Sequence, residues 1–338
     1  MKGEQTELAK FLRASKVQND YTLIPIRSGR NSQAYRVHVS SRDWFLKKYH
    51  HDSKDKRDRL GIEFHFLQFL WKRRIRQIPE PISCNTDHHF GLYSFISGSH
   101  PKEIESSHIS QAIQFLCRIN QFREAARINE LASASEACFS MREHIYSAER
   151  RLMNLIQMKD DSNIAKEARR FVEKKLLQKW DSTIKVINKA VLNYNFEQSI
   201  PQEERILSPS DFGFHNILEN ERGDLSFVDF EYAGWDDPAK LVCDFACQPE
   251  IPVSEKLWLQ FLEGMSEMLG ASSMYHRVKV LLPIYRLKWC CIMLNEFQSI
   301  DFQRRKHAGK DMNHLLDIQL TKAQDYFNQY VRGEVWLT

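Results

Sequence analysis

The 338-residue sequence lacks any apolar run that approaches the roughly 20 residues needed to span a bilayer. Its first residues, Met1 to Gln5, also lack the apolar core of a secretory signal peptide. Hydrophobic residues nevertheless make up 42% of the chain, which is enough for a globular core. These absences predict a soluble protein that does not associate with a membrane.

Paired cysteines are lacking as well. The seven cysteines are an odd number, and none of them shows the C-x-x-C spacing that is typical of zinc sites. We therefore expect neither a disulfide framework nor a zinc centre, and the pattern favours a reducing, cytoplasmic compartment. Cys243 and Cys247 lie four residues apart on a probable helix, where burial in the core is the expectation.

The chain has no large excess of charge, and its formal net charge of +4 arises from mixed charges. Two short basic clusters, 54–59 and 72–76, lack any recognised nucleic-acid-reading motif. They flank a predicted helix, and the second lies toward the C-terminal end, where cations are favoured. We expect them at the solvated ends of that helix, with an approach of Arg57 or Arg59 to a phosphate-binding cleft as the alternative. No nucleic-acid partner is expected.

What the sequence does contain is a set of oxygen ligands between Leu207 and Glu231. Asp211 and Asn216 fit the D-x-x-x-x-N pattern of a phosphoryl-transfer loop, and the apolar run 226–228 leads into Asp229. Such chemistry needs a carboxylate to orient a hydroxyl and accept its proton, and oxygen ligands for Mg²⁺ on the phosphate chain. The D-x-x-x-x-N loop is followed by a predicted hairpin at 220–223 and a strand that ends in an Asp-Phe step. This succession is more specific than the D-x-x-x-x-N pattern alone.

Two upstream residues fit the same chemistry. The predicted strand 44–49 contains Lys47 and Lys48, and a lysine in such a strand is costly to bury unless it is paired. Glu63 lies beside the apolar stripe of the following predicted helix and offers a partner. Because side chains alternate along a strand, only one of the two lysines can face a cleft.

Glycine is scarce where a phosphate-binding loop is expected. The segments 21–26 and 34–39 predict two strands joined by a tight polar loop. In this loop Gly29, Asn31 and Ser32 could lay backbone N–H groups over phosphates. With a single glycine, an ordinary hairpin turn is the alternative.

Extended segments dominate the first hundred or so positions, and helical periodicity dominates the remainder. Further helices are expected at 254–269 and 278–297, and Asp237 before Pro238 predicts another helix start. This order predicts an α+β architecture with a small β-rich N-terminal lobe and a large, mainly helical C-terminal lobe. One apolar stripe of the helical part comprises Val172, Leu176, Trp180, Ile184 and Ile187.

The segment VDFEYAGWDDPAKLVCDFA, Val228 to Ala246, resembles the aminoglycoside phosphotransferase and choline kinase superfamily. Its members carry an I-D-F-[ED]-x-A-G-x-x-D-P-x-x-D-[LF]-A type of sequence, and this chain has one extra residue before Asp244. The resemblance implies a protein-kinase-like bilobal fold, with a nucleotide-binding lobe at 1–97 and a catalytic and substrate lobe at 98–338. The connection at 93–98 would receive the adenine.

The resemblance also implies roles for single residues. The Leu46-Lys47 step matches the family and selects Lys47 over Lys48, so Lys47 would steady the phosphates of ATP and Glu63 would position Lys47. Asp211 would orient and deprotonate the acceptor, while Asn216 and Asp229 would hold Mg²⁺. The predicted activity is the ATP-dependent phosphorylation of a hydroxyl on an aminoglycoside-, sugar- or choline-like small molecule.

The sequence departs from the kinase pattern at two positions. Pro209 stands where kinases usually have a histidine two residues before the catalytic aspartate, and His215 is not placed to replace it. Glu231 stands where protein kinases have glycine, which favours a small-molecule substrate. The alternative function is a nucleotide-binding pseudokinase with a regulatory role. Pro209 and the glycine-poor loop favour the pseudokinase. The retention of all five predicted site residues opposes it, and these are Lys47, Glu63, Asp211, Asn216 and Asp229.

The sequence leaves the acceptor open. Acidic residues near the predicted cleft would suit a cationic acceptor, Trp235 and Trp289 could stack on a sugar or an amine, and Arg286 and Lys288 would suit an anion. For the segment 285–297, packing is favoured over any of these roles. The acidic residues considered are Glu231, Asp236, Asp237 and Glu296.

Overall fold

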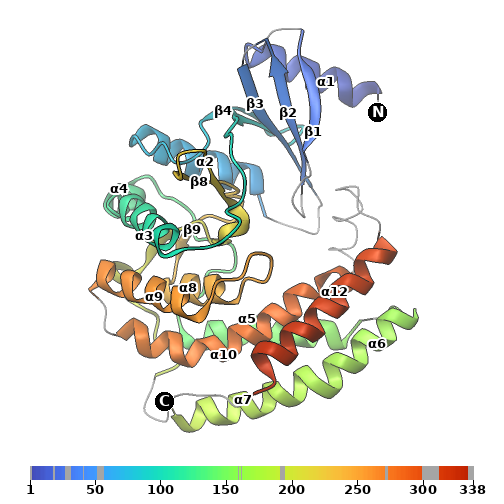
Figure 1. Ribbon diagram of the computed structural model, residues 1–338, viewed down its shortest axis with the longest axis vertical. Coiled ribbons are helices and arrows are strands. Elements are labelled where there is room, and N and C mark those ends of the chain that lie inside the picture. The colour runs from blue at the N-terminus through green and yellow to red at the C-terminus, as the bar shows by residue number, and fades with distance from the viewer. Residues whose placement is uncertain are drawn as a thin grey trace.

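The computed structural model describes residues 2–17, 20–26, 32–40, 42–51, 57–158, 160, 162–190, 195–270, 273–298 and 312–333. These residues form the predicted α+β architecture, with a small antiparallel sheet followed by a mostly helical region. Figure 1 shows the sheet at the top and most of the helices below it. The polar segment 207–231 lies in the helical region.

The sheet has five strands in the order β1-β2-β3-β5-β4, and every neighbouring pair is antiparallel. Strand β3 is central, so Lys47 lies opposite Ala34 on one side and Gly91 on the other. The strands predicted around 21–26, 34–39 and 44–49 are therefore present. The strands run Thr22–Ile26 (β1), Ser32–Val39 (β2), Arg42–Tyr49 (β3), Pro81–Asn85 (β4) and Phe90–Ser94 (β5).

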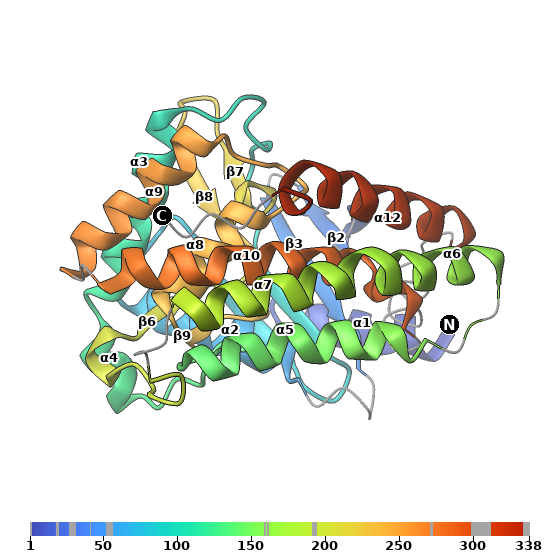
Figure 2. The same cartoon turned by 90° about the horizontal axis from the view of Figure 1, so that it is seen from below.

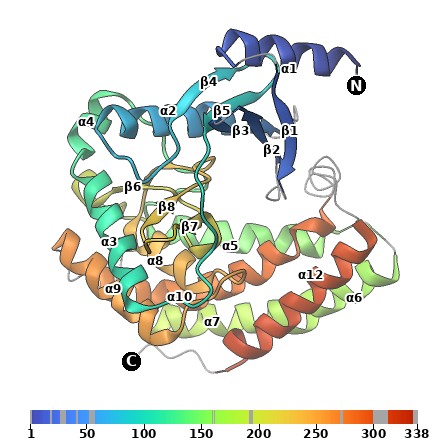
Figure 3. The same ribbon diagram turned by 45° about the horizontal axis from the view of Figure 1, so that its top comes forward.

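Helix α1 (Lys2–Ala14) packs against this sheet and lies beside it in Figure 3. Its residues Phe11 and Leu12 form a small separate core with strand residues that include Val37, Leu46 and Leu92. The sequence analysis did not anticipate this helix. Its apolar residues cover one face of a sheet that would otherwise expose that face to water.

Helix α2 (Arg59–Lys72) begins where Asp58 accepts a hydrogen bond from the Gly61 N–H. Its apolar side chains belong to the larger core of the helical region, so α2 is held from both sides. At its end Arg73 donates to the Phe69 carbonyl and Arg76 to the Trp71 carbonyl. The second basic cluster, 72–76, thus lies at the end of the helix, as expected. Residues 54–56 of the first basic cluster lie outside the described residues.

The helical region is built around α10, which contacts α5, α8 and α12. Figure 2 shows α5, α7, α10 and α12 running alongside one another. The predicted stripe from Val172 to Ile187 faces this core, and both Cys243 and Cys247 are buried, as predicted. The helices are α3 (Ser106–Asn120), α4 (Arg123–Ile128), α5 (Met141–Ile156), α6 (Asn163–Phe171), α7 (Leu177–Ala190), α8 (Pro238–Cys247), α9 (Glu255–Leu269), α10 (Ser273–Met293) and α12 (Met312–Tyr326). Among the described helices, none is both apolar and long enough to cross a bilayer.

Two short strand pairs carry the polar segment 207–231. Strand β6 (Ile206–Ser208) pairs with β9 (Gly234–Asp236), and β7 (Ile217–Glu219) forms the predicted hairpin with β8 (Leu225–Phe227). Strand β8 ends one residue before Val228, the predicted end. The Phe115 and Phe227 rings stack at 3.9 Å between centroids, which anchors this hairpin on helix α3.

Candidate active site

The loop after β6 places Asp211 through an unusual backbone conformation at Ser210, whose φ is 67°. This left-handed region is unfavourable for residues other than glycine and a few short polar ones. Three hydrogen bonds hold Ser210 in place. Its N–H donates to Ser208 Oγ at 2.9 Å, and its Oγ accepts from Lys240 Nζ at 3.0 Å and donates to the Ser135 carbonyl at 3.4 Å. Lys240 is itself buried between Asp236 and Asp244.

Asn216 ties Asp211 to the strand that precedes Asp229. Its Nδ2 donates to the Asp211 carbonyl at 2.9 Å, and its own carbonyl accepts from the Val228 N–H at 3.0 Å. Hydrogen bonds therefore link Asp211 to Asn216, and Asn216 to Val228, the residue before Asp229. His215 also contacts Asp211, with 3.1 Å between Nε2 and Oδ1. Burial opposes the charged form of His215, but the Asp211 carboxylate outweighs this effect and raises the pKa of His215.

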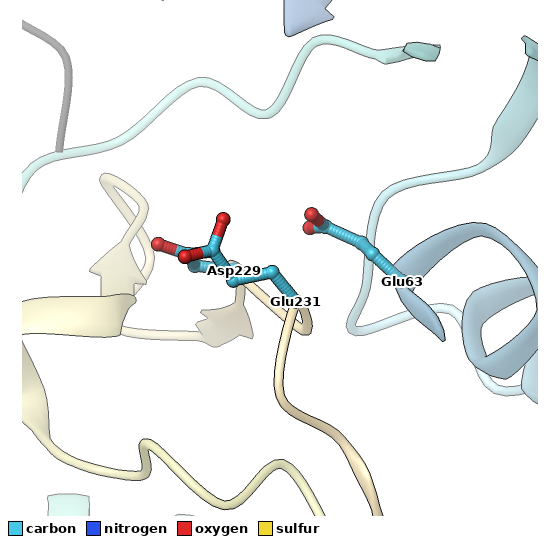
Figure 4. A group of neighbouring side chains, drawn as sticks. All are labelled: Glu63, Asp229 and Glu231. Carbon is cyan, nitrogen blue, oxygen red and sulfur yellow. The ribbon is translucent and has the colours of Figure 1, made fainter. Parts of the chain in front are cut away.

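Asp229 follows β8 with a φ of 65°, a conformation that aspartate tolerates better than most residues. Its Oδ1 lies 2.7 Å from Lys47 Nζ. Carboxylate oxygens of Glu63, Asp229 and Glu231 lie within 4.8 Å of one another, and Figure 4 shows Glu63 reaching from α2 toward the other two. Burial and the two neighbouring carboxylates raise the pKa of Asp229 to about 7, although Lys47 opposes the shift.

Lys47 is the cation at the centre of this cluster. It is 4% exposed, and its Nζ lies 2.8 Å from Glu63 and 3.1 Å from Glu231. Burial disfavours the charged ammonium, but the surrounding carboxylates raise the pKa of Lys47 well above its ordinary value. Lys47, the lysine selected in the sequence analysis, therefore forms the predicted pair with Glu63.

Two tyrosines that the sequence analysis missed complete the environment of Glu63. Tyr49 donates its hydroxyl hydrogen to Glu63 Oε2 at 2.5 Å, and the hydroxyls of Tyr49 and Tyr93 lie 2.8 Å apart. The Phe230 N–H donates to the other oxygen of Glu63 at 3.1 Å. Tyr49 could have been found from strand alternation, because it lies two residues after Lys47 on the same face.

The acidic residues considered for a cationic acceptor are buried, so that suggestion is wrong. Glu231 is 2% exposed and lies between Lys47 and Arg59, whose Nε is 3.8 Å away. Arg59 is itself 2% exposed, and its approach to a phosphate-binding cleft stays a prediction. Asp236, Asp237 and Glu296 are at most 1% exposed.

Each buried aspartate near the loop has a cationic or hydrogen-bonding partner. Asp236 accepts from Lys240 at 2.8 Å, while Asp237 caps α8 and contacts His144 and Arg277. Burial raises the pKa of Asp236 to about 6. These pairings are what a charge in the protein interior requires.

The predicted phosphate-binding loop is described only in part. Gly29 and Asn31 lie outside the described residues. Ser32 opens strand β2 and is 4% exposed. It lies opposite Tyr49 in the register with β3, two positions from Lys47.

We expect Lys47→Ala to lower kcat/KM for MgATP by about a hundredfold or more, because it removes a buried cation from the developing phosphate charge. The matched variant Lys48→Ala should lower kcat/KM for MgATP by less than about threefold, because strand alternation turns Lys48 away from this face. Steady-state kinetics on both variants, with circular dichroism to confirm folding, tests the pair. A larger loss for Lys48→Ala would contradict the assignment.

At Ser210 we expect the variant Ser210→Gly to be more stable than Ser210→Ala by about 1 kcal/mol, because only glycine accepts the left-handed backbone without cost. Both variants lose the bond to Lys240, so the difference isolates the backbone term. Urea unfolding measures it. At the exposed helical residue Ser182 of α7 the order should reverse, because glycine weakens a helix interior by about 1 kcal/mol relative to alanine. The same order at both sites would contradict the strain at Ser210.

Comparison with solved structures supports the kinase-like fold. Choline kinase from Cryptosporidium parvum Iowa II superposes with a TM-score of 0.56 at 14% identity, covering 96% of this chain and 97% of that one. Choline kinase LicA from Streptococcus pneumoniae gives 0.57 at 12% identity, covering 96% and 100%. Spectinomycin phosphotransferase APH(9)-Ia, in complex with ADP and spectinomycin, gives 0.56 at 16% identity, covering 94% and 98%.

At these identities the three structures establish a shared fold. No curated protein matches the sequence. A family model described as the phosphotransferase enzyme family matches residues 22–281. This range includes the sheet, the loop with Asp211 and Asn216, and the segment with Asp229. Because the match extends over more than half of the 338 residues, the chain belongs to the phosphotransferase enzyme family.

Proposed function

We propose that this protein is an ATP-dependent, Mg²⁺-requiring kinase that transfers the γ-phosphoryl group to a hydroxyl of a small molecule. The observation that carries the proposal is the contact of Lys47 with both Glu63 of α2 and Asp229 after β8. In kinases these are the groups that hold the phosphates and the metal. Family membership supports the reaction type, and the ADP complex of spectinomycin phosphotransferase supports an adenine nucleotide.

The residues present fit a magnesium ion. Carboxylate oxygens are hard ligands, and three of them lie within 4.8 Å of one another around Lys47. Burial, followed by the two neighbouring carboxylates, raises the pKa of Asp229, and a bound cation would oppose this shift by favouring the ionised carboxylate. Asp229 and Asn216 would hold the ion, which would neutralise charge on the phosphate oxygens.

The chain's own residues supply the remaining steps. Lys47 binds the α- and β-phosphates, and Glu63 holds the ammonium group in place. Asp211 orients the acceptor hydroxyl and takes its proton as the hydroxyl oxygen bonds to the γ-phosphorus. The bond from that phosphorus to the bridging oxygen breaks, and its electron pair leaves with ADP.

The lobe boundaries at 97 and 98 form part of the proposal. After β5 ends at Ser94, the chain reaches Gly98, and the next residue, Ser99, pairs with Glu219 of β7. Gly98 has a φ of 157°, and a Cβ there would lie 2.7 Å from the Glu219 carbonyl oxygen. The connection thus enters the helical lobe by a close backbone contact, and residues 93–98 would receive the adenine.

The acceptor is proposed at the level of its class, an aminoglycoside-, sugar- or choline-like alcohol. The similar structures are named as kinases of choline and spectinomycin, which supports a small molecule. Burial of the acidic residues near Asp211 removes the argument for a cationic acceptor over a neutral or anionic one. The panel of acceptors should therefore include all three charge types.

Two measurements test this function. Thermal unfolding with ATP should show a higher midpoint when Mg²⁺ is present than when it is absent, because a ligand that binds only the folded state stabilises it. ADP release should then be measured with choline, ethanolamine, spectinomycin, neutral sugars and sugar acids. No stabilisation by MgATP would contradict the proposal. Stabilisation without turnover of any acceptor would favour the regulatory pseudokinase.

A further inference from the structure

A histidine contacts the proposed catalytic carboxylate. Nε2 of His215 lies 3.1 Å from Oδ1 of Asp211, and the two side chains are 19% and 36% exposed. The contact is therefore partly accessible to solvent. His215 is four residues after Asp211 and immediately before Asn216, on the short turn Phe214–Asn216. This turn brings the imidazole back over the loop.

The surroundings of His215 determine which nitrogen donates. Nδ1 is buried and has no hydrogen-bond partner in the part of the chain that the structure describes. A neutral ring therefore keeps its proton on Nε2, because an Nδ1–H without an acceptor would carry the full desolvation cost. A charged ring has a proton on Nε2 as well. In either state Nε2 donates a hydrogen bond to Asp211.

Packing holds the ring in this position. A Cβ on Gly213 would lie 2.9 Å from His215 Nδ1 and 3.3 Å from Gln248 Cγ, closer than side-chain atoms normally approach. Gly213 has an extended backbone, with a φ of −178°, so glycine is required here for space and not for its conformational freedom. The ring, Gly213 and Gln248 thus form one packed unit.

From this geometry we infer that His215 is a positioning residue for Asp211, whose carboxylate it holds in one orientation toward the acceptor hydroxyl. The inference rests on the proposed function. Asn216 binds the Asp211 carbonyl at 2.9 Å, so two consecutive residues fix the backbone and the side chain of the same aspartate. A partly exposed carboxylate without such a bond samples several rotamers, and each unproductive rotamer lowers the fraction of competent complexes.

His215→Ala should lower kcat by about ten- to a hundredfold, as the loss of a group that orients a catalytic residue commonly does. The KM for ATP and the unfolding midpoint should stay close to wild type. His215→Gln should recover most of the rate, because its amide nitrogen can reach the position of Nε2. Gly213→Ala should reproduce part of the loss, because it displaces the ring and leaves its chemistry unchanged.

The matched control is His38→Ala. His38 also pairs with a carboxylate, with 2.7 Å between its Nδ1 and Asp43 Oδ1, but it lies on β2 in the sheet. Its removal should leave kcat unchanged. A double variant completes the test. When Asp211→Asn is already present, adding His215→Ala should lower kcat by less than a further factor of about two, because a residue that acts through Asp211 then has no carboxylate left to position.

The outcomes separate this inference from the proposed function. With MgATP and the acceptor that gives the highest ADP release, a wild-type rate for His215→Ala beside an impaired Asp211→Asn would overturn the positioning role alone. His215→Gln as impaired as His215→Ala, or additive losses in the double variant, would also overturn it, because His215 would then act independently. Wild-type protein without turnover of any acceptor or of water would overturn the proposed function, and this inference with it.

Discussion

Asp211→Asn should bind MgATP nearly as tightly as the wild type but turn over about a hundred- to ten-thousand-fold more slowly, the range typical of losing a general base. Asp211 contacts His215 and Asn216 of its own loop, whereas Lys47 contacts Glu63 and Asp229. Nucleotide binding and chemistry should therefore separate in this variant.

The measurement is ADP formation with the best acceptor of the panel, alongside nucleotide affinity on the same preparation. Asp224→Asn is the matched control, because it neutralises an aspartate in the exposed turn between β7 and β8. Equal turnover in wild type and Asp211→Asn would show that the activity does not use this loop. Tight MgATP binding by a wild type without turnover would instead support a regulatory role.

Asp229→Ala should abolish the Mg²⁺-dependent part of the stabilisation by ATP while the protein stays folded. Its carboxylate is 2.7 Å from Lys47, which keeps Glu63 and Glu231 as partners when Asp229 is removed. The nucleotide-free variant should not be less stable than wild type, because one of three neighbouring carboxylates is gone. At a free MgATP concentration of about 100 times Kd, the wild type should gain about 2.7 kcal/mol that the variant lacks.

Thermal unfolding with ATP, at zero and saturating Mg²⁺, measures this difference. Asp317→Ala on the exposed side of α12 is the control for loss of an aspartate at a distance from the site. Unchanged Mg²⁺ dependence in folded Asp229→Ala would remove Asp229 from the metal site. It would also weaken the kinase function as a whole.

Motif spacing predicted the residue types of the candidate site well. Asp211 and Asn216 lie in one short loop, so their spacing could be recognised in the sequence. In the structure Asn216 binds both Asp211 and Val228, the residue before Asp229. The choice of Lys47 over Lys48 likewise depended on local matching and strand alternation, and the ion pair with Glu63 confirms the pairing. The roles of these residues stay predictions until the variants are measured.

Burial was harder to predict. The sequence placed Asp236 and Asp237 near the predicted cleft, but both are fully buried in the structure. Asp236 pairs with Lys240, and Asp237 pairs with His144 and Arg277. Lys240 is only four residues after Asp236, but His144 and Arg277 come from α5 and α10, and no local pattern indicates which residues will meet when separate helices pack. Helix α1 was missed for a related reason, because it is held by its contact with the sheet.

The sequence by itself determined the architecture in outline and the start of α8 at Asp237. It also determined that a loop with Asp211, a hairpin and Asp229 follow one another along the chain. Each depends on residues within a few positions of one another, where periodicity, capping and turn preferences act. Only the tertiary structure decided that Lys47 meets Asp229, 182 positions away, and that Tyr49 and Tyr93 join Glu63. Such contacts depend on how separate elements pack and on which charges are thereby removed from water, and these are properties of the whole fold.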